Sequence, residues 1–251
     1  MKAERTFEEK QGVYALERRD DLAVLRLGKN FLFESIDLSS SKRLLDLIDQ
    51  ISKSAAIKVL AIINCSEKAG SKEYIDFCRH AIDTEFDRRT IQVMCNVFDE
   101  LIVRIAGFNK VIVHADCGHI IPVFLNLSLA CDYRIVTTHA IFQKPYFELG
   151  LLPKGGGPFF LCKLLGVRKA RKIFMSDENI NALEALALGM VDQVVPYHRL
   201  EESAVLMARG LAKMPTRSLI GIKRLINYSI KDLKDYLGLE SQELYKTLGA
   251  F

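Results

Sequence analysis

The stretch from Asn109 to Pro196 decides the fold. It opens with an apolar, strand-like run, Lys110-Val111-Ile112-Val113-His114, then Cys117-Gly118-His119 and a helix-like run, Pro122-Val123-Phe124-Leu125-Asn126-Leu127-Ser128-Leu129-Ala130-Cys131-Asp132. A short strand, the turn Gly150-Leu151-Leu152-Pro153 and the glycines Gly155-Gly156-Gly157 follow. Pro122 suits the first position of a helix, where no backbone N–H is needed. This layout predicts free N–H groups at a helix start beside a glycine-rich turn, where a developing oxyanion or a phosphate can bind.

Strands and helices alternate on both sides of this stretch. Before it we expect a β-hairpin (Gly12–Arg19 with Leu22–Leu27), a helix capped within Ser39–Ser41 and a buried strand over Lys58–Asn64. We then expect a loop over Cys65–Thr84 that holds at most one helical turn, and a helix over Arg88–Gly107. Towards its end and beyond it we expect helices over Phe159–Leu165 and Arg168–Met175, a capping box at Asn181 and Glu184, a strand over Val191–Val195 and three amphipathic helices. The order predicts a layered α/β core over residues 1–196 and a helical region over residues 197–251.

Composition and charge narrow the classes of function. The 251 residues carry a net charge of +4, which is too weak to indicate nucleic-acid binding without a clustered basic face. No apolar run reaches the ~20 residues of a membrane span. The six cysteines are scattered without metal-ligand spacing, as expected of reduced thiols. The first ten residues are charged throughout, unlike a signal peptide. We therefore expect a cytoplasmic protein with no metal, nucleic-acid or membrane partner.

Several motifs of the deciding stretch follow one another in a familiar order. They are Leu127-Ser128-Leu129-Ala130-Cys131-Asp132-Tyr133-Arg134-Ile135, Ala140-Ile141-Phe142, Leu149-Gly150-Leu151-Leu152-Pro153, the three glycines, Leu164-Leu165-Gly166 and the run from Ala182 to Pro196. Their order and spacing resemble the crotonase (enoyl-CoA hydratase/isomerase) superfamily. The resemblance implies a crotonase-like α/β fold of repeated ββα units, with C-terminal helices that contact other subunits of a homotrimer or a dimer of trimers. It also implies a pocket for CoA thioesters, with no cofactor beyond the CoA of the substrate, and two backbone N–H groups that hold the thioester enolate.

The two loops that would hold the enolate depart from the family pattern. Where the family usually has three glycines after the equivalent of Gly118, this sequence reads Pro122-Val123-Phe124, so one donor would be the N–H of Val123. Proline donates nothing, but at the first helical position it leaves the next N–H free at the positive end of the helix. In the other loop, Lys68 to Asp76, either Tyr74 or Ile75 would supply the second N–H. We expect an oxyanion hole that the valine side chain narrows.

The two glutamates that hydratases of the family use fall at Asn126 and Tyr146. An amide is no general base, and a tyrosine with a pKa of about 10 is a poor one, so ordinary hydration of an enoyl-CoA is disfavoured. Glu148 lies two residues after Tyr146, and in an extended segment both side chains would leave the same face. Glu148 would then be a relocated acid/base, with Tyr146 as its proton donor or hydrogen-bond partner. The alternative is a surface carboxylate beside a packed ring.

Two more residues near the expected pocket carry open alternatives. Lys154 stands where the family commonly has glycine, and it either meets a carboxylate or phosphate or is solvated. His119 follows Gly118 and is either an acid/base or a hydrogen-bonded histidine at the helix entrance.

Two classes of function fit these residues. One is an atypical enzyme on an acyl-CoA or acyl-carrier thioester, for which isomerisation, decarboxylation or thioester cleavage is favoured over hydration. Its catalytic residues would be Tyr146, Glu148 and Asn126, and its substrate-binding residues Tyr74, Ile75, Gly118, His119, Val123 and Lys154. The other class is a catalytically inactive relative that binds acyl-CoA or a partner protein, as the missing glutamates and altered loops suggest.

Overall fold

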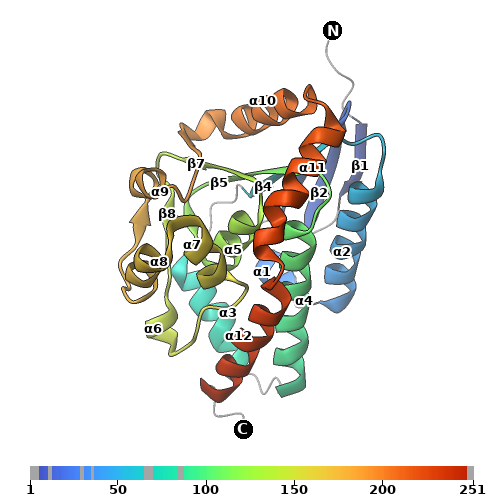
Figure 1. Cartoon of the computed structure of the whole chain (residues 1–251). Coiled ribbons are helices and arrows are strands. Elements are labelled where there is room, and N and C mark those ends of the chain that lie inside the picture. Colours follow the sequence, from blue (N-terminus) through green and yellow to red (C-terminus); the bar gives the residue numbers. More distant parts are fainter. Residues whose placement is uncertain are drawn as a thin grey trace.

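Two sheets organise the computed structural model, which describes residues 6–10, 13–28, 31–34, 37–64, 70–83 and 88–247 (Figure 1). The main sheet has the strand order β1 (Thr6–Lys10), β2 (Tyr14–Arg19), β3 (Leu22–Leu27), β4 (Val59–Asn64), β5 (Val111–Asp116), β7 (Tyr133–Thr137) and β10 (Gln193–Val195). β1 to β3 pair antiparallel, and every later pair of neighbours is parallel. The small sheet joins β6 (His119–Ile120), β8 (Ile141–Phe142) and β9 (Ile180–Asn181).

Helices cover both faces of the main sheet, which confirms the layered α/β prediction. One face packs its alternate side chains, such as Leu60 and Ile62 of β4, into the larger core with α2 (Leu38–Lys53), α4 (Arg88–Ala106) and α5 (Pro122–Ala130). The other face packs Val59, Ala61 and Ile63 against α10 (Leu200–Ala212). Burial on both faces explains why β4 is a continuous apolar run.

The remaining helices are shorter or lie around this core (Figure 1). They are α1 (Phe31–Glu34), α3 (Ser71–Asp83), α6 (Tyr146–Leu149), α7 (Gly157–Leu165), α8 (Val167–Phe174), α9 (Ala182–Leu188), α11 (Thr216–Asn227) and α12 (Leu233–Thr247). The predicted capping box of α9 is confirmed, because Asn181 Oδ1 accepts from the Glu184 N–H while the Glu184 carboxylate accepts from the Asn181 N–H. None of the described helices is long and apolar enough to cross a membrane.

Two local predictions on the N-terminal side were wrong. The loop expected over Cys65–Thr84 contains the helix α3, since Tyr74, Ile75 and Cys78 recur at helical spacing and Ile75 and Cys78 are buried. Residues 65–69 and 84 of that prediction lie outside the described ranges. The cap of α2 is Asp37 rather than a residue of Ser39–Ser41, because the Asp37 carboxylate accepts from the Ser39 and Ser40 N–H groups.

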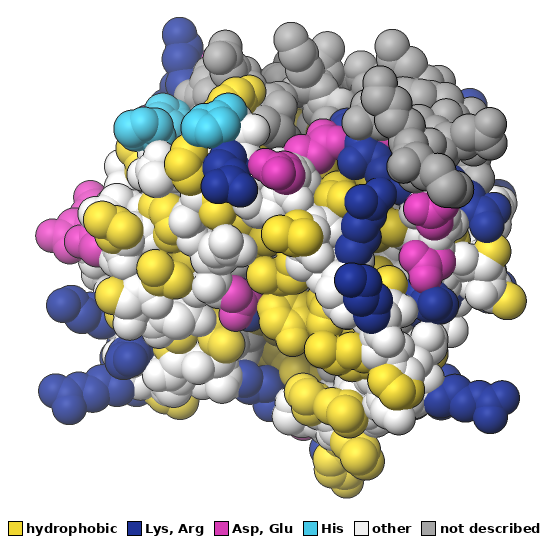
Figure 2. All heavy atoms as spheres, turned by 90° about the horizontal axis from the view of Figure 1, so that it is seen from above, with side chains coloured by type: hydrophobic (Ala, Val, Ile, Leu, Met, Phe, Trp, Pro, Cys, Tyr) yellow, Lys and Arg dark blue, Asp and Glu magenta, His cyan; other side chains and the backbone are white. Residues whose placement is uncertain are grey.

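An apolar surface lies over α10 and α11. Hydrophobic side chains gather in the middle and lower part of the face seen from above in Figure 2, the side on which α10 and the start of α11 lie in Figure 1. The exposed apolar residues of these two helices and their flanks are Leu206, Met214, Ile222, Leu225, Ile226 and Tyr228, which are 50–80% exposed. Exposed apolar side chains that gather on one face in this way are typical of interaction sites.

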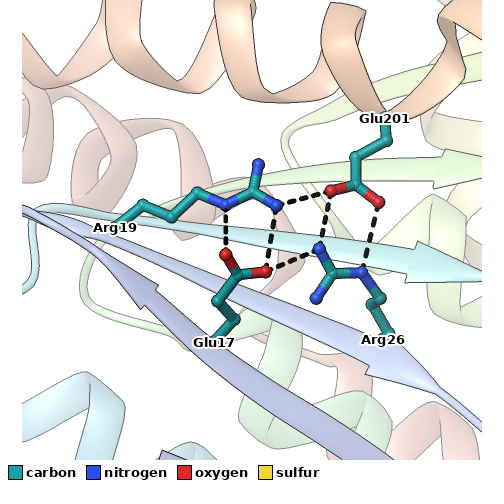
Figure 3. Close-up of polar contacts among 4 residues, drawn as sticks. All are labelled: Glu17, Arg19, Arg26 and Glu201. Atoms are coloured by element: carbon teal, nitrogen blue, oxygen red, sulfur yellow. Dashed lines mark hydrogen bonds and ion pairs between the residues drawn. The ribbon is translucent and has the colours of Figure 1, made fainter. Parts of the chain in front are cut away.

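Four charged side chains fasten α10 to the predicted hairpin, which is confirmed as β2 and β3 (Figure 3). Arg19 donates to Glu17 Oε1 at 2.8 Å and to Glu201 Oε1 at 2.7 Å, and Arg26 donates to Glu17 Oε2 at 2.7 Å and to Glu201 Oε1 at 2.6 Å. The hydrogen bond from Arg19, followed by that from Arg26, lowers the pKa of Glu17 to about 2 against the opposing effect of burial. The buried charges are therefore paired.

Candidate active site

Asn126 is fully buried on α5 and faces the turn that carries the three glycines. Its Nδ2 donates to the carbonyl oxygen of Lys154 at 2.6 Å, whereas its Oδ1 has no hydrogen-bond partner within the described ranges. Gly157 lies directly against that oxygen, since a Cβ built on Gly157 would be 2.6 Å from Asn126 Oδ1. The amide thus binds the turn with one end and presents an unsatisfied acceptor at the other.

The glycine turn itself is held by a carboxylate from the last helix. Gly155 and Gly156 have φ of 99° and 83°, in the left-handed region that favours glycine. Their N–H groups donate to Glu240 Oε2 at 2.8 and 3.0 Å. Glu240 comes from α12 and is only 7% exposed. Two successive amides around one carboxylate form a small anion-binding nest that the chain fills by itself.

Burial raises the pKa of Glu240 to about 7. The N–H of Gly156, the charge of Lys154 and the N–H of Gly155 oppose this rise, and the charge of Asp99 adds to it. Sequence reasoning missed Glu240 altogether. A signal was present, because Glu240 falls between Leu237 and Leu244 on the apolar face of the predicted last helix.

Lys154 forms an ion pair with Asp99 of α4. Its Nζ donates to both carboxylate oxygens, and the two side chains are only 11% and 15% exposed. Burial raises the pKa of Asp99, while the charge of Lys154 and its hydrogen bond oppose the rise. Of the two predicted alternatives, Lys154 therefore meets a carboxylate, but that carboxylate belongs to the chain itself.

Tyr146 and Glu148 do not share a face, so of the two predicted alternatives the structure shows the surface carboxylate beside a packed ring and not the relocated acid/base. The segment is the short helix α6 rather than an extended strand, and positions two apart on a helix point about 200° away from each other. Tyr146 is 4% exposed, and its hydroxyl has no partner in the described part of the chain. Glu148 is a surface carboxylate, 58% exposed, with Arg79 Nη2 at 3.9 Å from its Oε1.

The buried tyrosine belongs to the same centre as Asn126. Its ring lies 6.3 Å from that of Phe174, whose Cζ would be 3.3 Å from a Cβ on Gly157. Burial, followed by the charge of Glu240, raises the pKa of Tyr146 far above its usual value of 10. Tyr146 is accordingly a neutral phenol at any physiological pH.

The predicted donors of the oxyanion hole have different outcomes. The N–H of Val123, second residue of α5, has no acceptor among the residues the structure describes, while those of Phe124 and Leu125 donate to Ile121 O at 3.0 Å. Tyr74 cannot serve, since its N–H donates to Gly70 O at 3.1 Å. Ile75 is the fifth residue of α3, where N–H groups are bonded within the helix. The prediction that Tyr74 or Ile75 donates the second N–H is therefore wrong for both residues, because both N–H groups are bonded within α3 or its first turn.

His119 and Gly118 lie where the small sheet meets the start of α3. The carbonyl of Gly118 accepts from the Ile141 N–H at 2.9 Å. His119 Nδ1 is buried without a partner in the described ranges, and a Cβ on Gly70 would lie 2.3 Å from it. The role of His119 as acid/base or structural residue stays a prediction. No group of three or more His, Cys, Asp or Glu in the described residues is placed to hold a metal ion.

Comparisons with known proteins agree with this architecture. The profile of the enoyl-CoA hydratase/isomerase family matches residues 76–249. The fatty acid oxidation complex subunit alpha of Shewanella amazonensis is 30% identical over 212 residues, which cover 81% of this chain and 29% of that protein. The trans-2-decenoyl-[acyl-carrier-protein] isomerase of Streptococcus mutans is 24% identical over 230 residues, 90% of this chain and 86% of that one.

Solved structures show the same fold. The structure of Pseudomonas aeruginosa DspI has a TM-score of 0.78 and 25% identity, covering 95% of this chain and 90% of that chain. This chain spans less than a third of the Shewanella protein and about half (51%) of the probable mitochondrial enoyl-CoA hydratase of Dictyostelium discoideum. The profile match and the shared fold together show that the chain belongs to the enoyl-CoA hydratase/isomerase family, the crotonase superfamily.

Proposed function

We propose that the chain acts on an acyl-CoA or acyl-carrier thioester through an enolate, without the carboxylate pair that hydration uses. The observation that carries this proposal is a pair of buried atoms that have no hydrogen-bond partner among the described residues. Asn126 Oδ1 lies against the glycine turn, and Tyr146 Oη belongs to a ring that packs near Phe174, which approaches the same turn. A buried polar group without a partner costs about 1–3 kcal/mol. A ligand that supplies the partners explains why the chain keeps both groups.

The chemistry follows from what each group can donate. The Val123 N–H at the start of α5 would hold the thioester oxygen as it becomes an oxyanion. Tyr146, held neutral by its burial, would give a proton to the enolate carbon and regain one from water. Asn126 would orient the acyl group through its free acceptor. This set supplies proton donors and hydrogen bonds, but no exposed carboxylate base at the two family positions.

Among isomerisation, decarboxylation and thioester cleavage, decarboxylation needs the fewest catalytic groups beyond the Val123 N–H, Tyr146 and Asn126. Loss of CO₂ from a β-carboxyacyl thioester leaves the electron pair of the broken C–C bond in the enolate, so no base has to remove a proton. The α-carbon then takes a proton from Tyr146. Isomerisation needs a base for its first step, and thioester cleavage needs an activated water.

The test is turnover of a panel of malonyl-, methylmalonyl-, 3-enoyl-, 2-enoyl- and saturated acyl-CoA by the full chain. We expect Tyr146→Phe to lower kcat by about 10²–10⁴ with little change in KM. Two controls should keep wild-type rates: Tyr228→Phe, because that ring is 70% exposed, and Glu148→Gln, because that carboxylate is on the surface. Hydration of 2-enoyl-CoA as the main activity would contradict the proposal.

A second candidate is a catalytically inactive relative that binds acyl-CoA or a partner protein. It is favoured by the ion pair of Lys154 with Asp99 and by the hydrogen bonds of the Gly155 and Gly156 N–H groups to Glu240, because these groups are bonded within the chain itself. Titration calorimetry with the same CoA esters separates the two. Binding without turnover across the panel would support the inactive relative.

The predicted homotrimer, or dimer of trimers, is a further part of the proposal. The apolar surface over α10 and α11 supports it, since burying exposed leucine and isoleucine side chains against another copy is favourable (Figure 2). Leu225→Glu with Ile226→Glu should convert the assembly to monomers in sedimentation velocity runs. A wild-type monomer at micromolar concentration would contradict it. The cytoplasmic location stays a prediction.

A further inference from the structure

Helix α8 and the end of α7 carry a concentrated positive charge. We call the exposed side chains of Lys163, Arg168, Lys169, Arg171 and Lys172 the α8 basic face. No Asp or Glu occurs from residue 163 to residue 175. Five cations exceed the net charge of +4 of the whole chain, so the rest of the chain is close to neutral. This segment therefore carries five positive charges with no acidic residue of its own to balance them.

Within the described part of the chain, no acidic side chain pairs with this face. None of the ion pairs among the described residues involves one of its five cations, and Lys163 lies 4.8 Å over the ring of Phe159. The next acidic residues along the chain, Asp177 and Glu178, act on the buried Lys144. Arg168 and Lys172 stand four apart on one helix, a like-charge spacing that costs about 0.2–0.5 kcal/mol. The helix keeps an arrangement that weakens it.

The opposite side of α8 forms part of the wall of the candidate active site. Ala170 and Ile173 are buried, and Phe174 packs on Tyr146 and approaches Gly157. In Figure 1, α8 lies at the outer margin next to α7 and close to α6. The cations thus point outward from a helix whose inner side touches the residue that we propose to donate the proton.

The composition of this face favours a protein partner. The exposed side chains of Val167 and Met175 flank the cations, which gives the mixture of charge and apolar contact typical of protein interfaces. A membrane is disfavoured, because the apolar side of α8, with Ala170 and Ile173, is packed inward rather than exposed for insertion. Single-stranded nucleic acid is disfavoured, because the aromatic residue of α8, Phe174, faces the interior rather than stacking bases.

We infer that the α8 basic face docks the acidic helical surface of a carrier protein that delivers the acyl thioester. This inference rests on the proposed thioester chemistry and adds the form in which the substrate arrives. Opposite charges would steer the carrier to α8 and set its register, and the effect would weaken with salt. The acyl group would then enter beside Tyr146.

The experiment measures binding of a purified, acidic bacterial acyl carrier protein, loaded with a crotonyl thioester, to the full chain at 50 mM and 300 mM NaCl. The test variant is Arg168→Glu with Lys172→Glu, and Arg168→Gln with Lys172→Gln is a milder second variant. The matched control, Lys42→Glu with Arg43→Glu, makes the same change of charge on exposed positions of α2. Crotonyl-CoA binding is measured in parallel for every variant, together with the melting temperature.

We expect wild type and control to bind the carrier alike, the test variant to lose at least about tenfold in affinity and the Gln pair to lose less. Binding of crotonyl-CoA should be unchanged in all of them. Equal carrier binding by test and control variants would overturn the inference, as would wild type that binds crotonyl-CoA but no carrier. The inference would also be overturned if the test variant lost binding to RNA or to anionic vesicles but still bound the carrier. Failure to bind either thioester would instead contradict the proposed function.

Discussion

Asn126 and Glu240 bind the two ends of one peptide group. The carbonyl of Lys154 accepts from Asn126 Nδ2 at 2.6 Å, and the N–H of Gly155, in the same peptide group, donates to Glu240 Oε2 at 2.8 Å. In a trans peptide the C=O and the N–H point in opposite directions, so the amide and the carboxylate lie on opposite sides of the turn. Glu240 is therefore a positioning residue that supports the turn from behind, with Asn126 in front.

The first prediction concerns pH. The folded-state pKa of Glu240, about 7, exceeds its ordinary value of 4.5, so the native state holds an extra proton between these two pH values. Its contribution to stability is complete below about pH 4.5 and is lost as the pH rises through about 7. The groups that face it are Lys154, Asp99, Tyr146 and Tyr236. Between these pH values the free energy of unfolding of the wild type should fall by at most about 3 kcal/mol because of this group, and Glu240→Gln should remove that fall.

Urea unfolding from pH 4.5 to 8 measures this effect as the difference between wild type and Glu240→Gln. Glu243→Gln, on the same helix but more exposed and paired with Lys246, is the control and should follow wild type. Parallel pH profiles of wild type and Glu240→Gln would show that this carboxylate does not titrate in the predicted range.

The second prediction concerns space at the glycine turn. Gly157→Ala would place a Cβ 2.6 Å from Asn126 Oδ1, a contact that fully buried side chains cannot relieve without strain. We expect a loss of about 1–3 kcal/mol in the free energy of unfolding. Gly210→Ala in α10 meets nothing within 4 Å and should stabilise by about 0.5–1 kcal/mol. If Asn126→Ala in the same chain does not offset the cost of Gly157→Ala, the clash is not its cause.

The third prediction concerns the ion pair of Lys154 and Asp99. Lys154→Met leaves a buried carboxylate unpaired, which costs about 3 kcal/mol in chemical unfolding at pH 8. Lys246→Met breaks the exposed pair with Glu243 and should cost less than about 1 kcal/mol. Equal costs for the two substitutions would mean that the Lys154 pair behaves as a surface pair.

The fourth prediction separates the stability of Tyr146 from its proposed role in turnover. Because its hydroxyl has no partner in the described ranges, Tyr146→Phe should leave the free energy of unfolding unchanged within about 0.5 kcal/mol or raise it. Tyr236→Phe should lower the free energy of unfolding by about 1 kcal/mol, because it removes the hydrogen bond between that hydroxyl and Glu240. A clear destabilisation by Tyr146→Phe would reveal a structural partner of the hydroxyl.

The fold was predictable from the sequence because its local signals agree with one another. Pro122 at a helix start, the Asn181–Glu184 capping box and the apolar runs that became β4 and β5 each point to one conformation. Polar segments without a clear period, such as the one containing α3, were harder, because only a few apolar residues mark the buried side of that helix.

The site was less predictable, because its groups meet only through tertiary packing. Asn126 and Tyr146 were identified as site positions from motif order, and the structure places both in one buried centre. Whether Glu148 lies beside them depends on whether the four residues Tyr146–Leu149 form a helix or a strand. The sequence of so short a segment does not specify this choice. Glu240 and Asp99 come from distant helices, and no local pattern links either residue to the glycine turn.

The bond between Gly155 and Glu240 spans 85 positions of the chain. A growing polypeptide makes the glycine turn long before it makes the carboxylate that fixes it, so the sheet and most of its helices can form while the polar centre is still loose. Assembly of that centre has to wait for α12 to leave the ribosome. The polar centre is thus completed only after the strands and the glycine turn that surround it have been synthesised.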